Sequence, residues 1–271
     1  PELYLKRLLV GGLEKVYELN RNFRNEGIST RHNPEFTMLE VYESYADYED
    51  MMTMTEDLVS SLVQELTGGY KIIYQGKEID FTPPWERRSF AKIVKEKFDI
   101  DPSDDVKAML AKVQVKKRVA TDEVLTRSGV MKLVEDFLDE EATNNPIFLI
   151  DYFTFLSPLA KAKEDNPLLA QRFECFIAGL EVGNAYSELN DPTEQRARLL
   201  EDLKDDTETG LRSIDEDFVN ALEYGMPPAG GLGIGIDRLV MILSDASSIR
   251  DVILFPLLKP HGKKEDGHHD V

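Results

Sequence analysis

Cysteine is nearly absent from this chain of 271 residues, which contains only Cys175. One cysteine cannot form an internal disulfide framework, and such low usage is typical of a reducing, cytosolic compartment. The sequence also has no apolar run long enough to cross a bilayer and no recognisable signal peptide. We therefore expect a cytoplasmic protein without membrane contact. Because the chain opens with Pro1 rather than methionine, the sequence also suggests a start inside a larger protein.

Positive charge is scarce as well. The chain has 32 lysines and arginines against 51 aspartates and glutamates, which gives a formal net charge of −19. A protein that grips RNA through its phosphates usually carries basic stretches, and only short groups such as residues 115–118 occur here. Any RNA contact is therefore made either by other parts of a larger protein or by a local patch. The hydrophobic content of 42% is enough for one large core, with or without an inserted subdomain.

Two alternating runs joined by a polar loop lie within residues 16–45 and predict an antiparallel hairpin. On the first run one parity is apolar and the other polar, as in Tyr17, Leu19 and Phe23 against Glu18, Asn20, Asn22, Arg24 and Glu26. The return run separates Leu39 and Val41 from Phe36, Met38, Glu40 and Tyr42. The intervening residues 27–34 contain glycine, serine, asparagine and proline, which favour turns. Because strand side chains alternate between two faces, we expect one face in a core and the other lining a site.

A second informative stretch covers residues 173–191 and predicts two strands with a turn at Ala178 and Gly179. Its carboxylates Glu174, Glu181 and Glu188 are separated by odd intervals, so simple alternation cannot place all three on one face. A β-bulge near Gly183 would reconcile them, and bulges often lie beside active sites. Buried carboxylates at this density need cations to offset their desolvation, which favours a site over a purely structural strand.

Residues 229–243 read AGGLGIGIDRLVMIL and predict a glycine-rich strand followed by an apolar helix over residues 237–243. Arg238 falls in the first turn of that helix, where free N–H groups already favour an anion. The glycine order does not match a dinucleotide-binding loop. Two arginines and several carboxylates without a nucleophile–base pair indicate a polyphosphate site with a bridging metal. That inventory fits attack on a nucleoside triphosphate.

Periodicity and turn residues predict the remaining elements. We expect helices over residues 2–10, with Leu5, Leu8 and Leu9 as its apolar stripe, and over 48–67, 89–98, 106–113, 128–141, 192–217 and 216–224. A small hairpin is predicted over residues 70–81, turning at Gln75 and Gly76, and further strands over 146–155 and 250–256.

These elements predict a core in two parts, residues 1–84 and 146–262, interrupted by an inserted helical subdomain at residues 85–145. A polar tail follows at residues 263–271, where His268 and His269 are expected to be tail residues rather than ligands. The acidic residues of the insertion favour solvated helix faces, with a metal site as the alternative: Asp104, Asp105, Asp139, Glu140 and Glu141.

Several segments resemble the catalytic domain of class II lysyl-tRNA synthetases. FRNEG, the loop with Arg31 and His32, and NPEFTMLEVY resemble motif two in its lysyl version, and GIGIDRL resembles motif three. SPLAK at residues 157–161 and RDVILFP at residues 250–256 also resemble family segments. The resemblance implies an α+β fold with an antiparallel sheet flanked by helices. Neither motif one, which builds the family's dimer interface, nor the anticodon-binding domain is recognisable in this sequence.

The resemblance also implies roles for individual residues. Arg24 would hold the α-phosphate of ATP, Glu26 the adenine amino group, and Arg238 the γ-phosphate. His32 would lie against the phosphates and Phe36 against adenine, while Glu174 and Glu181 would bind Mg²⁺. The lysine pocket would comprise Glu2, which contacts the α-amino group, with Glu40, Tyr42, Asn184, Tyr186, Glu188 and Gly233.

The activity implied is activation of lysine with ATP to lysyl-adenylate, followed by transfer to the 3′ end of tRNA(Lys). One alternative is a stand-alone paralogue that transfers a lysine-like group to a protein lysine, as the elongation-factor-P-modifying relatives do. GNAYSELND and Gly233 follow the synthetase pattern and argue against it. The other alternative is a truncated nucleotide-binding fragment without full activity. The family also predicts a homodimer.

Overall fold

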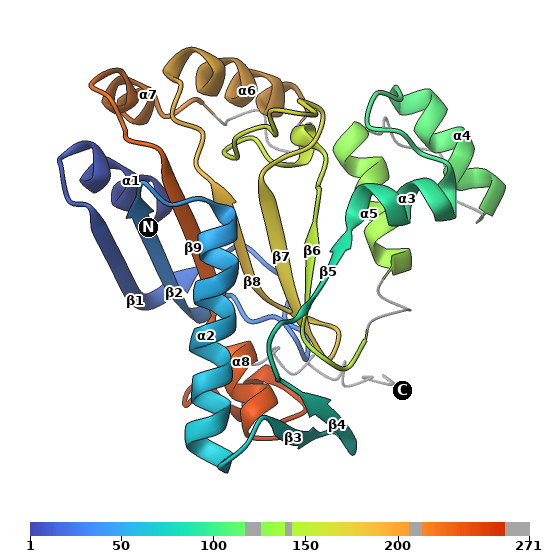
Figure 1. The fold of residues 1–271 in the computed structure, drawn as a ribbon. Coiled ribbons are helices and arrows are strands. Elements are labelled where there is room, and N and C mark those ends of the chain that lie inside the picture. The colour runs from blue at the N-terminus through green and yellow to red at the C-terminus, as the bar shows by residue number, and fades with distance from the viewer. Residues whose placement is uncertain (117–125, 139–142, 206–212, 258–271) are drawn as a thin grey trace, which may run out of the picture.

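A seven-stranded sheet forms the centre of the computed structural model, which describes residues 1–116, 126–138, 143–205 and 213–257 (Figure 1). In spatial order its strands are β1 (Lys15–Phe23), β2 (Glu35–Ser44), β9 (Ala229–Gly235), β8 (Leu180–Ser187), β7 (Arg172–Ile177), β6 (Ile147–Ile150) and β5 (Glu86–Ser89). Neighbouring strands are antiparallel except β5 and β6, which pair in parallel at one edge. The predicted α+β class is confirmed, and the sheet is mixed rather than wholly antiparallel.

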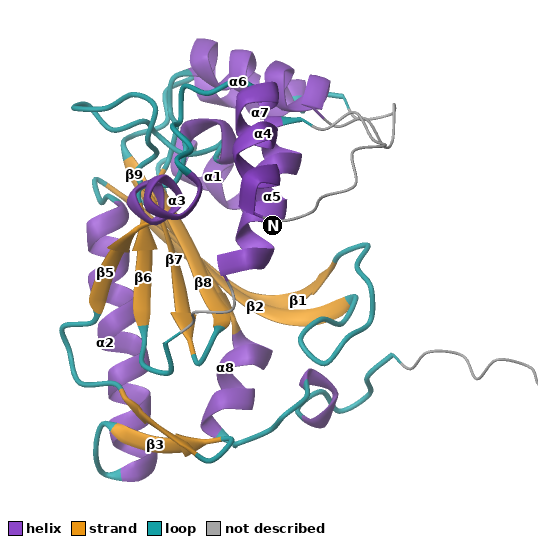
Figure 2. Ribbon diagram, turned by 90° about the vertical axis from the view of Figure 1, so that its right-hand side faces the viewer, coloured by secondary structure: helices purple, strands orange, loops and turns teal. Residues whose placement is uncertain are grey.

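Helix α2 (Tyr48–Thr67) runs along one face of the sheet, and α8 (Ile236–Leu243) joins the same core (Figures 1 and 2). Met51 and Met52 are fully buried there, as the methionine spacing suggested. Asp47 caps the start of α2 with a capping box, and Gly68 ends it in the left-handed conformation. None of the described helices, α2 included, combines the length and the apolar surface of a membrane span.

The hairpin of β3 (Lys71–Tyr74) and β4 (Lys77–Asp80) lies beyond the end of the main sheet (Figure 2). It turns at Gln75 and Gly76, both with positive φ, as predicted.

Three helices gather at the opposite end of the sheet: α1 (Glu2–Val10), α6 (Pro192–Asp205) and α7 (Glu216–Glu223) (Figure 1). Leu5 and Leu9 of α1 pack with Phe218 of α7 and Tyr42 of β2. The predicted apolar stripe of α1 is wrong at one position, because Leu8 is 42% exposed and Lys6 is buried instead. A charged residue thus lies on the face of α1 that meets the sheet.

Helices α3 (Phe90–Phe98), α4 (Val106–Lys116) and α5 (Arg127–Leu138) form a second core beside the sheet (Figure 1). Phe90 stacks on Tyr152 at 4.5 Å between ring centroids. The division of the chain into a core and an inserted helical subdomain stays a prediction. The boundary expected at residue 85 falls before β5, which belongs to the main sheet.

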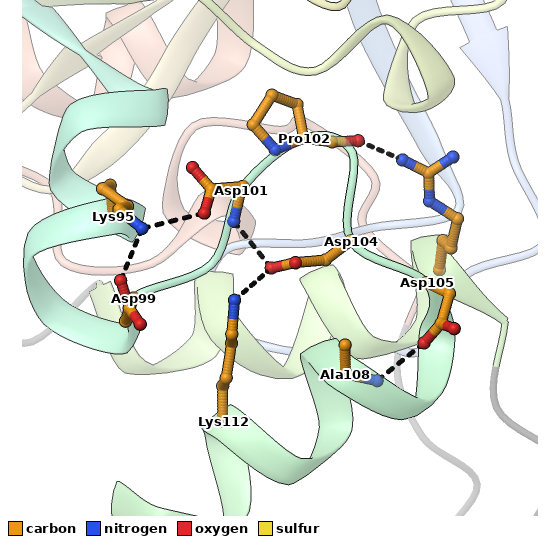
Figure 3. A network of polar contacts seen from close by, with 9 residues as sticks. Lys95, Asp99, Asp101, Pro102, Asp104, Asp105, Ala108 and Lys112 are labelled. Atoms are coloured by element: carbon orange, nitrogen blue, oxygen red, sulfur yellow. Dashed lines mark hydrogen bonds and ion pairs between the residues drawn. The ribbon is translucent and has the colours of Figure 1, made fainter.

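Acidic residues in this region form ion pairs within the protein (Figure 3). Lys95 contacts Asp99 at 2.5 Å and Asp101 at 2.8 Å, and Lys112 lies 2.5 Å from Asp104. The Asp105 carboxylate accepts the backbone N–H of Ala108 in the first turn of α4. Among the described residues, no three His, Cys, Asp or Glu side chains gather as they would around a metal ion. Residues 139–141 lie outside the described residues.

Two predicted strands differ from the structure. The run over residues 146–155 is a strand only at Ile147–Ile150, because Asp151 has a φ of +62° and the chain leaves the sheet. A 3₁₀ helix, η2 (Thr154–Leu156), follows. The closing strand expected over residues 250–256 is instead the 3₁₀ helix η3 (Ile249–Asp251) and a turn, which Ser248 caps by accepting the N–H of Arg250.

Only one of the two strands of the first hairpin buries its apolar side chains in a core. Leu39 and Val41 on β2 pack against the core under α2, as expected. On the edge strand β1, Tyr17, Leu19 and Phe23 remain 59–74% exposed, so their expected burial is wrong for the described chain. The helices α2 and α8 pack mainly on β2, β7, β8 and β9, whereas β1 meets α1, which leaves Tyr17, Leu19 and Phe23 exposed.

Candidate active site

A cavity of about 270 Å³ opens on the sheet face opposite α2, between the β1–β2 hairpin, β8, β9 and α8. It brings together segments from both ends of the chain. The predicted site residues that line it are Glu2, Arg24, Glu26, His32, Phe36, Glu40, Tyr42, Glu181, Asn184, Tyr186, Gly233 and Arg238. Of the predicted set, Glu174 and Glu188 lie outside this lining.

Two arginines from distant segments define one end of the cavity. The Arg24 guanidinium lies 5.2 Å above the ring of Phe36, and its side chain is 60% exposed. Arg238 donates a hydrogen bond of 2.7 Å from Nη1 to the backbone carbonyl of Glu181, which fixes its direction. An accessible cation and a fixed one thus share the cavity, an arrangement suited to a bound anion.

The loop between β1 and β2 presents His32 beside these arginines. Ser29 holds the loop closed, because its backbone N–H donates to the carbonyl of His32 and its hydroxyl lies 3.0 Å from Nδ1 of His32. Burial and the nearby Arg238 lower the pKa of His32. A neutral imidazole next to two cations marks this end of the cavity as electropositive.

Glu181 and Glu174 form an acidic pair beside the arginines. Burial, followed by the charge of Glu174, raises the pKa of Glu181 to about 7. The Glu181 side chain is 42% exposed, so solvent still reaches it. Glu174 is held by Arg172 at 2.5 Å and by the hydroxyl of Tyr152 at 2.5 Å. With both partners engaged, Glu174 does not belong to the lining of the cavity.

The β-bulge expected near Gly183 is present. Cys175 pairs with Gly183 and Phe176 pairs with Glu181, which leaves Val182 as the extra residue on β8. This one-residue insertion places Glu181 on the same face as Asn184 and Tyr186 despite the odd spacing.

The other end of the cavity is acidic and aromatic. The Tyr42 hydroxyl donates to Oε2 of Glu40 at 3.2 Å, and the Tyr186 hydroxyl donates to Oε1 of Glu2 at 3.4 Å. Burial raises the pKa of Glu40. Carboxylates that are held by tyrosines in a half-closed space can bind ammonium groups.

Glu188 lies behind this end of the cavity and is fully buried. Its Oε2 is ion-paired with the ammonium of Lys6 at 2.6 Å and its Oε1 has no ion-pair partner, while neither oxygen accepts a hydrogen bond of good geometry in the described part of the chain. Burial, opposed by Lys6, raises the pKa of Glu188 to about 8. A Cβ on Gly231 would lie 1.9 Å from Oε1, so only glycine leaves room for this carboxylate.

Three residues of this arrangement were missing from the sequence prediction: Lys6, Arg172 and Gly231. Lys6 follows Glu2 by four residues, a spacing that places both on one side of a helix, yet a lysine there usually reaches solvent. Arg172 precedes the predicted strand, and Gly231 stands among several glycines of similar context. Only their contacts in the folded structure distinguish these three residues from ordinary structural ones.

An α+β domain whose motif-two-like hairpin and glycine-rich strand–helix unit direct two arginines into one cavity has the fold and site of a class II synthetase. The family model "tRNA synthetases class II (D, K and N)" matches residues 1–259, and the chain belongs to this family. The resemblance in motifs two and three is thereby confirmed.

Curated relatives refine this placement. A "Lysine--tRNA ligase" of Thermoanaerobacter sp. (strain X514) is 55% identical over 264 residues, 96% of this chain and 52% of the relative. Those of Thermotoga maritima and Nostoc punctiforme are 50% identical over 268 residues and 52% identical over 266 residues, covering 98% and 96% of this chain and 53% and 47% of the relatives. The chain spans about half the length of the curated relatives that it matches.

Proposed function

We propose that the chain activates lysine with ATP to form lysyl-adenylate and transfers the lysyl group to the 3′ end of tRNA(Lys). The observation that carries this proposal is one cavity with two arginines at one end and tyrosine-held carboxylates at the other. The printed name of the relatives, lysine–tRNA ligase, supports the same substrate.

At the electropositive end, Arg24 binds the α-phosphate and Arg238 the γ-phosphate of ATP. Glu26 accepts from the adenine amino group, and the base stacks on Phe36, whose ring already lies under Arg24. His32 lies against the phosphates. A carboxylate oxygen of lysine attacks the α-phosphorus, and the bond to the bridging oxygen of the β-phosphate breaks, so pyrophosphate leaves. Arg24 stabilises the charge that develops on the α-phosphate in this step.

Glu174 and Glu181 would hold Mg²⁺. Two neighbouring carboxylates, one with a pKa raised in part by the other, fit a cation that commonly takes one or two carboxylates and completes its shell with phosphates and water. The bound ion would neutralise phosphate charge.

The acidic end binds lysine. Glu2 pairs with the α-ammonium, and Glu188, Glu40 and Tyr42 receive the side-chain ammonium. Asn184 and Tyr186 line the pocket wall. Gly233 leaves room beside them, since a Cβ there would lie 3.0 Å from Met38. The unpartnered Oε1 of Glu188 is the acceptor that a second ammonium would satisfy.

We extend the proposal to the family's other properties: a cytoplasmic protein that binds the acceptor end of tRNA(Lys) and forms a homodimer. Transfer follows when a hydroxyl of the terminal ribose attacks the carbonyl carbon of lysyl-adenylate and AMP leaves.

The test is ATP–pyrophosphate exchange by the chain with lysine. Norleucine, which lacks only the side-chain ammonium, is the matched amino acid. We expect exchange with lysine alone. Equal exchange with both, or none with lysine together with no lysine binding in calorimetry, would refute the proposal. Labelled lysine supplied with tRNA and with a protein acceptor then separates tRNA charging from modification of a protein lysine.

A further inference from the structure

Lys6 is a charged residue in a place where helices normally put leucine. Its side chain is 1% exposed, on the face of α1 that carries the buried Leu5 and Leu9. Lysine is rarely buried to this degree unless its ammonium is paired. The Lys6 ammonium lies 2.7 Å from Oε1 of Glu2 and 2.6 Å from Oε2 of Glu188. It therefore joins two carboxylates that stand 186 positions apart in the chain, as residues 2 and 188.

The contacts divide the Glu188 carboxylate into two halves. Oε2 forms the ion pair with Lys6, while Oε1 lies over Gly231 and takes part in no ion pair, and neither oxygen accepts a hydrogen bond of good geometry in the described residues. Tyr42 is the other neighbour of Gly231, so the free oxygen lies next to a side chain that lines the cavity. An unpaired, fully buried carboxylate oxygen is costly unless a ligand completes it.

We propose that Lys6 is a positioning residue for the amino-acid pocket: its ammonium favours the ionised form of Glu188 and aligns it, so that Oε1 is offered to the side-chain ammonium of the substrate. This inference rests on the proposed function, since it assumes lysine as the substrate. Lys6 itself touches neither substrate nor reacting atoms.

The charges around Glu188 give the physical reason. The groups that face it are Lys6 and Glu2 from α1, Glu40 and Tyr42 from β2, and Tyr186 from β8. Lys6 is the only cation among these side chains, and two of the others are carboxylates. Without Lys6, Glu188 would be a buried acid beside like charges and would hold its proton to higher pH. A neutral carboxyl group loses most of its attraction for an ammonium.

The pKa values agree in direction. Burial would lower the pKa of Lys6, but Glu188 and Glu2 outweigh it and raise this pKa, so the ammonium stays charged. The pKa of Glu188 is about 8 even with Lys6 opposing the effect of burial. Lysine affinity should therefore increase as the pH rises through this pKa. Loss of Lys6 should move that increase to higher pH.

The experiment compares Lys6→Met with the wild-type chain. Carboxyl-labelled glutamate allows the titration of Glu188 to be followed by NMR, with Glu188→Gln identifying the signal, and calorimetry measures lysine and ATP affinity between pH 6.5 and 9. In Lys6→Met we expect the Glu188 carboxyl group to titrate at higher pH than in the wild-type chain. Lysine binding should weaken about 10- to 100-fold at pH 7.5, while ATP affinity changes less than about twofold.

Matched variants separate positioning from packing. Arg7→Met removes the neighbouring positive charge of α1, which pairs with Asp215 at 2.9 Å, and should leave both readouts near wild type. Lys6→Arg keeps the charge and should return the titration toward wild type. In a Glu188→Gln background, Lys6→Met should add little further loss, because the two residues act as one unit. Lys6→Gln, which retains donors but no charge, replaces Lys6→Met if that variant does not fold.

An unchanged Glu188 titration in a folded Lys6→Met protein would overturn the inference. Equal losses of lysine affinity on removing Lys6 from the wild-type chain and from the Glu188→Gln variant would also overturn it. A different result would refute the proposed function: a wild-type chain that binds lysine no better than norleucine. In that case the titration still decides whether Lys6 favours the ionised form of Glu188, while the assignment to lysine recognition is lost.

Discussion

Single residues give the two halves of the cavity opposite charge. Arg24 and Arg238 carry positive charge into one end of the cavity, and Glu2 and Glu40 carry negative charge into the other. Lysine carries its carboxylate next to the α-ammonium and a second ammonium at the far end of its side chain, and ATP brings a chain of phosphates. Under the proposed function, lysine and ATP would meet where the halves join, with the carboxylate of lysine next to the α-phosphate.

Arg24→Ala should abolish most of the adenylate formation while the fold is retained. The side chain is 60% exposed and its contacts, with Phe36, Met38 and Glu26, lie at the cavity, so its loss removes charge stabilisation rather than core packing. We expect kcat for ATP–pyrophosphate exchange to fall about 100- to 1000-fold, as for loss of one transition-state donor. Arg21→Ala removes an equally exposed arginine of β1, paired with Glu35, and serves as the control. Near-normal exchange by Arg24→Ala would rule out its phosphate role.

Motifs that specify both residue type and spacing pointed to residues that the structure brings together. Arg24, Glu26 and Arg238 were proposed from such motifs, and the cavity brings them together. Lys6 could not be found in this way, because a lysine on a short amphipathic helix usually lies at the surface. Its burial depends on Glu188, whose position is set by strand pairing far along the chain.

Strand β9 shows how an element can be shaped by what it lacks. Gly231 pairs with Tyr42 on one side and with Tyr186 on the other, so a gap opens between two aromatic side chains on the site face. The Glu188 carboxylate fills that gap. Glycine in a strand interior weakens pairing, and here it provides the space for a charged group to approach the backbone.

Gly231→Ala should therefore damage lysine recognition more than nucleotide binding. A methyl group would meet Glu188 Oε1 at 1.9 Å and the Tyr42 ring at 2.6 Å, so both side chains must move. We expect lysine affinity to fall at least about tenfold and stability to fall by about 1–3 kcal/mol from overpacking. Calorimetry with lysine and with ATP, and thermal unfolding, measure these effects. Gly69→Ala adds the same methyl group where nothing lies within 4 Å and should change neither. Unaltered lysine binding by Gly231→Ala would exclude Glu188 from the pocket.

Elements with strong local signals were predicted closely. Helix α2 spans Tyr48–Thr67 as expected, because its cap Asp47, its methionine spacing and Gly68 agree. Strand ends depended on distant contacts instead. The run after Ile150 is apolar enough to continue as a strand, yet Tyr152 and Phe153 leave the sheet to pack with Phe90 of α3. The local sequence does not show that packing against α3 outweighs continued strand pairing.

The whole molecule carries a formal charge of −19, and its site holds a buried carboxyl group within that negative field. Burial raises the pKa of Glu188 most, and the surrounding negative charge cannot relieve it. Without substrate, the folded state therefore holds a proton on Glu188 at neutral pH that the unfolded state has already released. This difference makes the stability of the entire domain depend on pH.

The sign of this dependence follows from linkage. Glu188 has a pKa of about 8 when folded, above the ordinary value of 4.5, so the folded chain binds more protons between these limits. The free energy of unfolding must then decrease as pH rises from 4.5 through 8, and this decrease ends above the folded pKa. Glu181, whose folded pKa is about 7, contributes in the same direction but mainly below pH 7. His32 and Asp99, with lowered pKa values, also act below pH 7, and the raised pKa of Lys6 acts above its usual value. Burial also raises the pKa of Cys175, which acts in the same direction near pH 9, so the contribution of Glu188 is the difference between the wild-type chain and a Glu188→Gln variant from pH 7 to pH 9.

We expect the Tm of the ligand-free chain to fall by roughly 4 °C from pH 7 to pH 9, measured by circular dichroism. Glu188→Gln cannot titrate and should lose most of this slope, while Glu65→Gln on the exposed side of α2 should keep it. Saturating lysine should raise Tm more at pH 8.5 than at pH 7, because its ammonium stabilises the ionised carboxylate. A flat Tm profile in the wild-type chain would mean that Glu188 is already ionised at pH 7 without substrate, and Lys6 alone would then satisfy it.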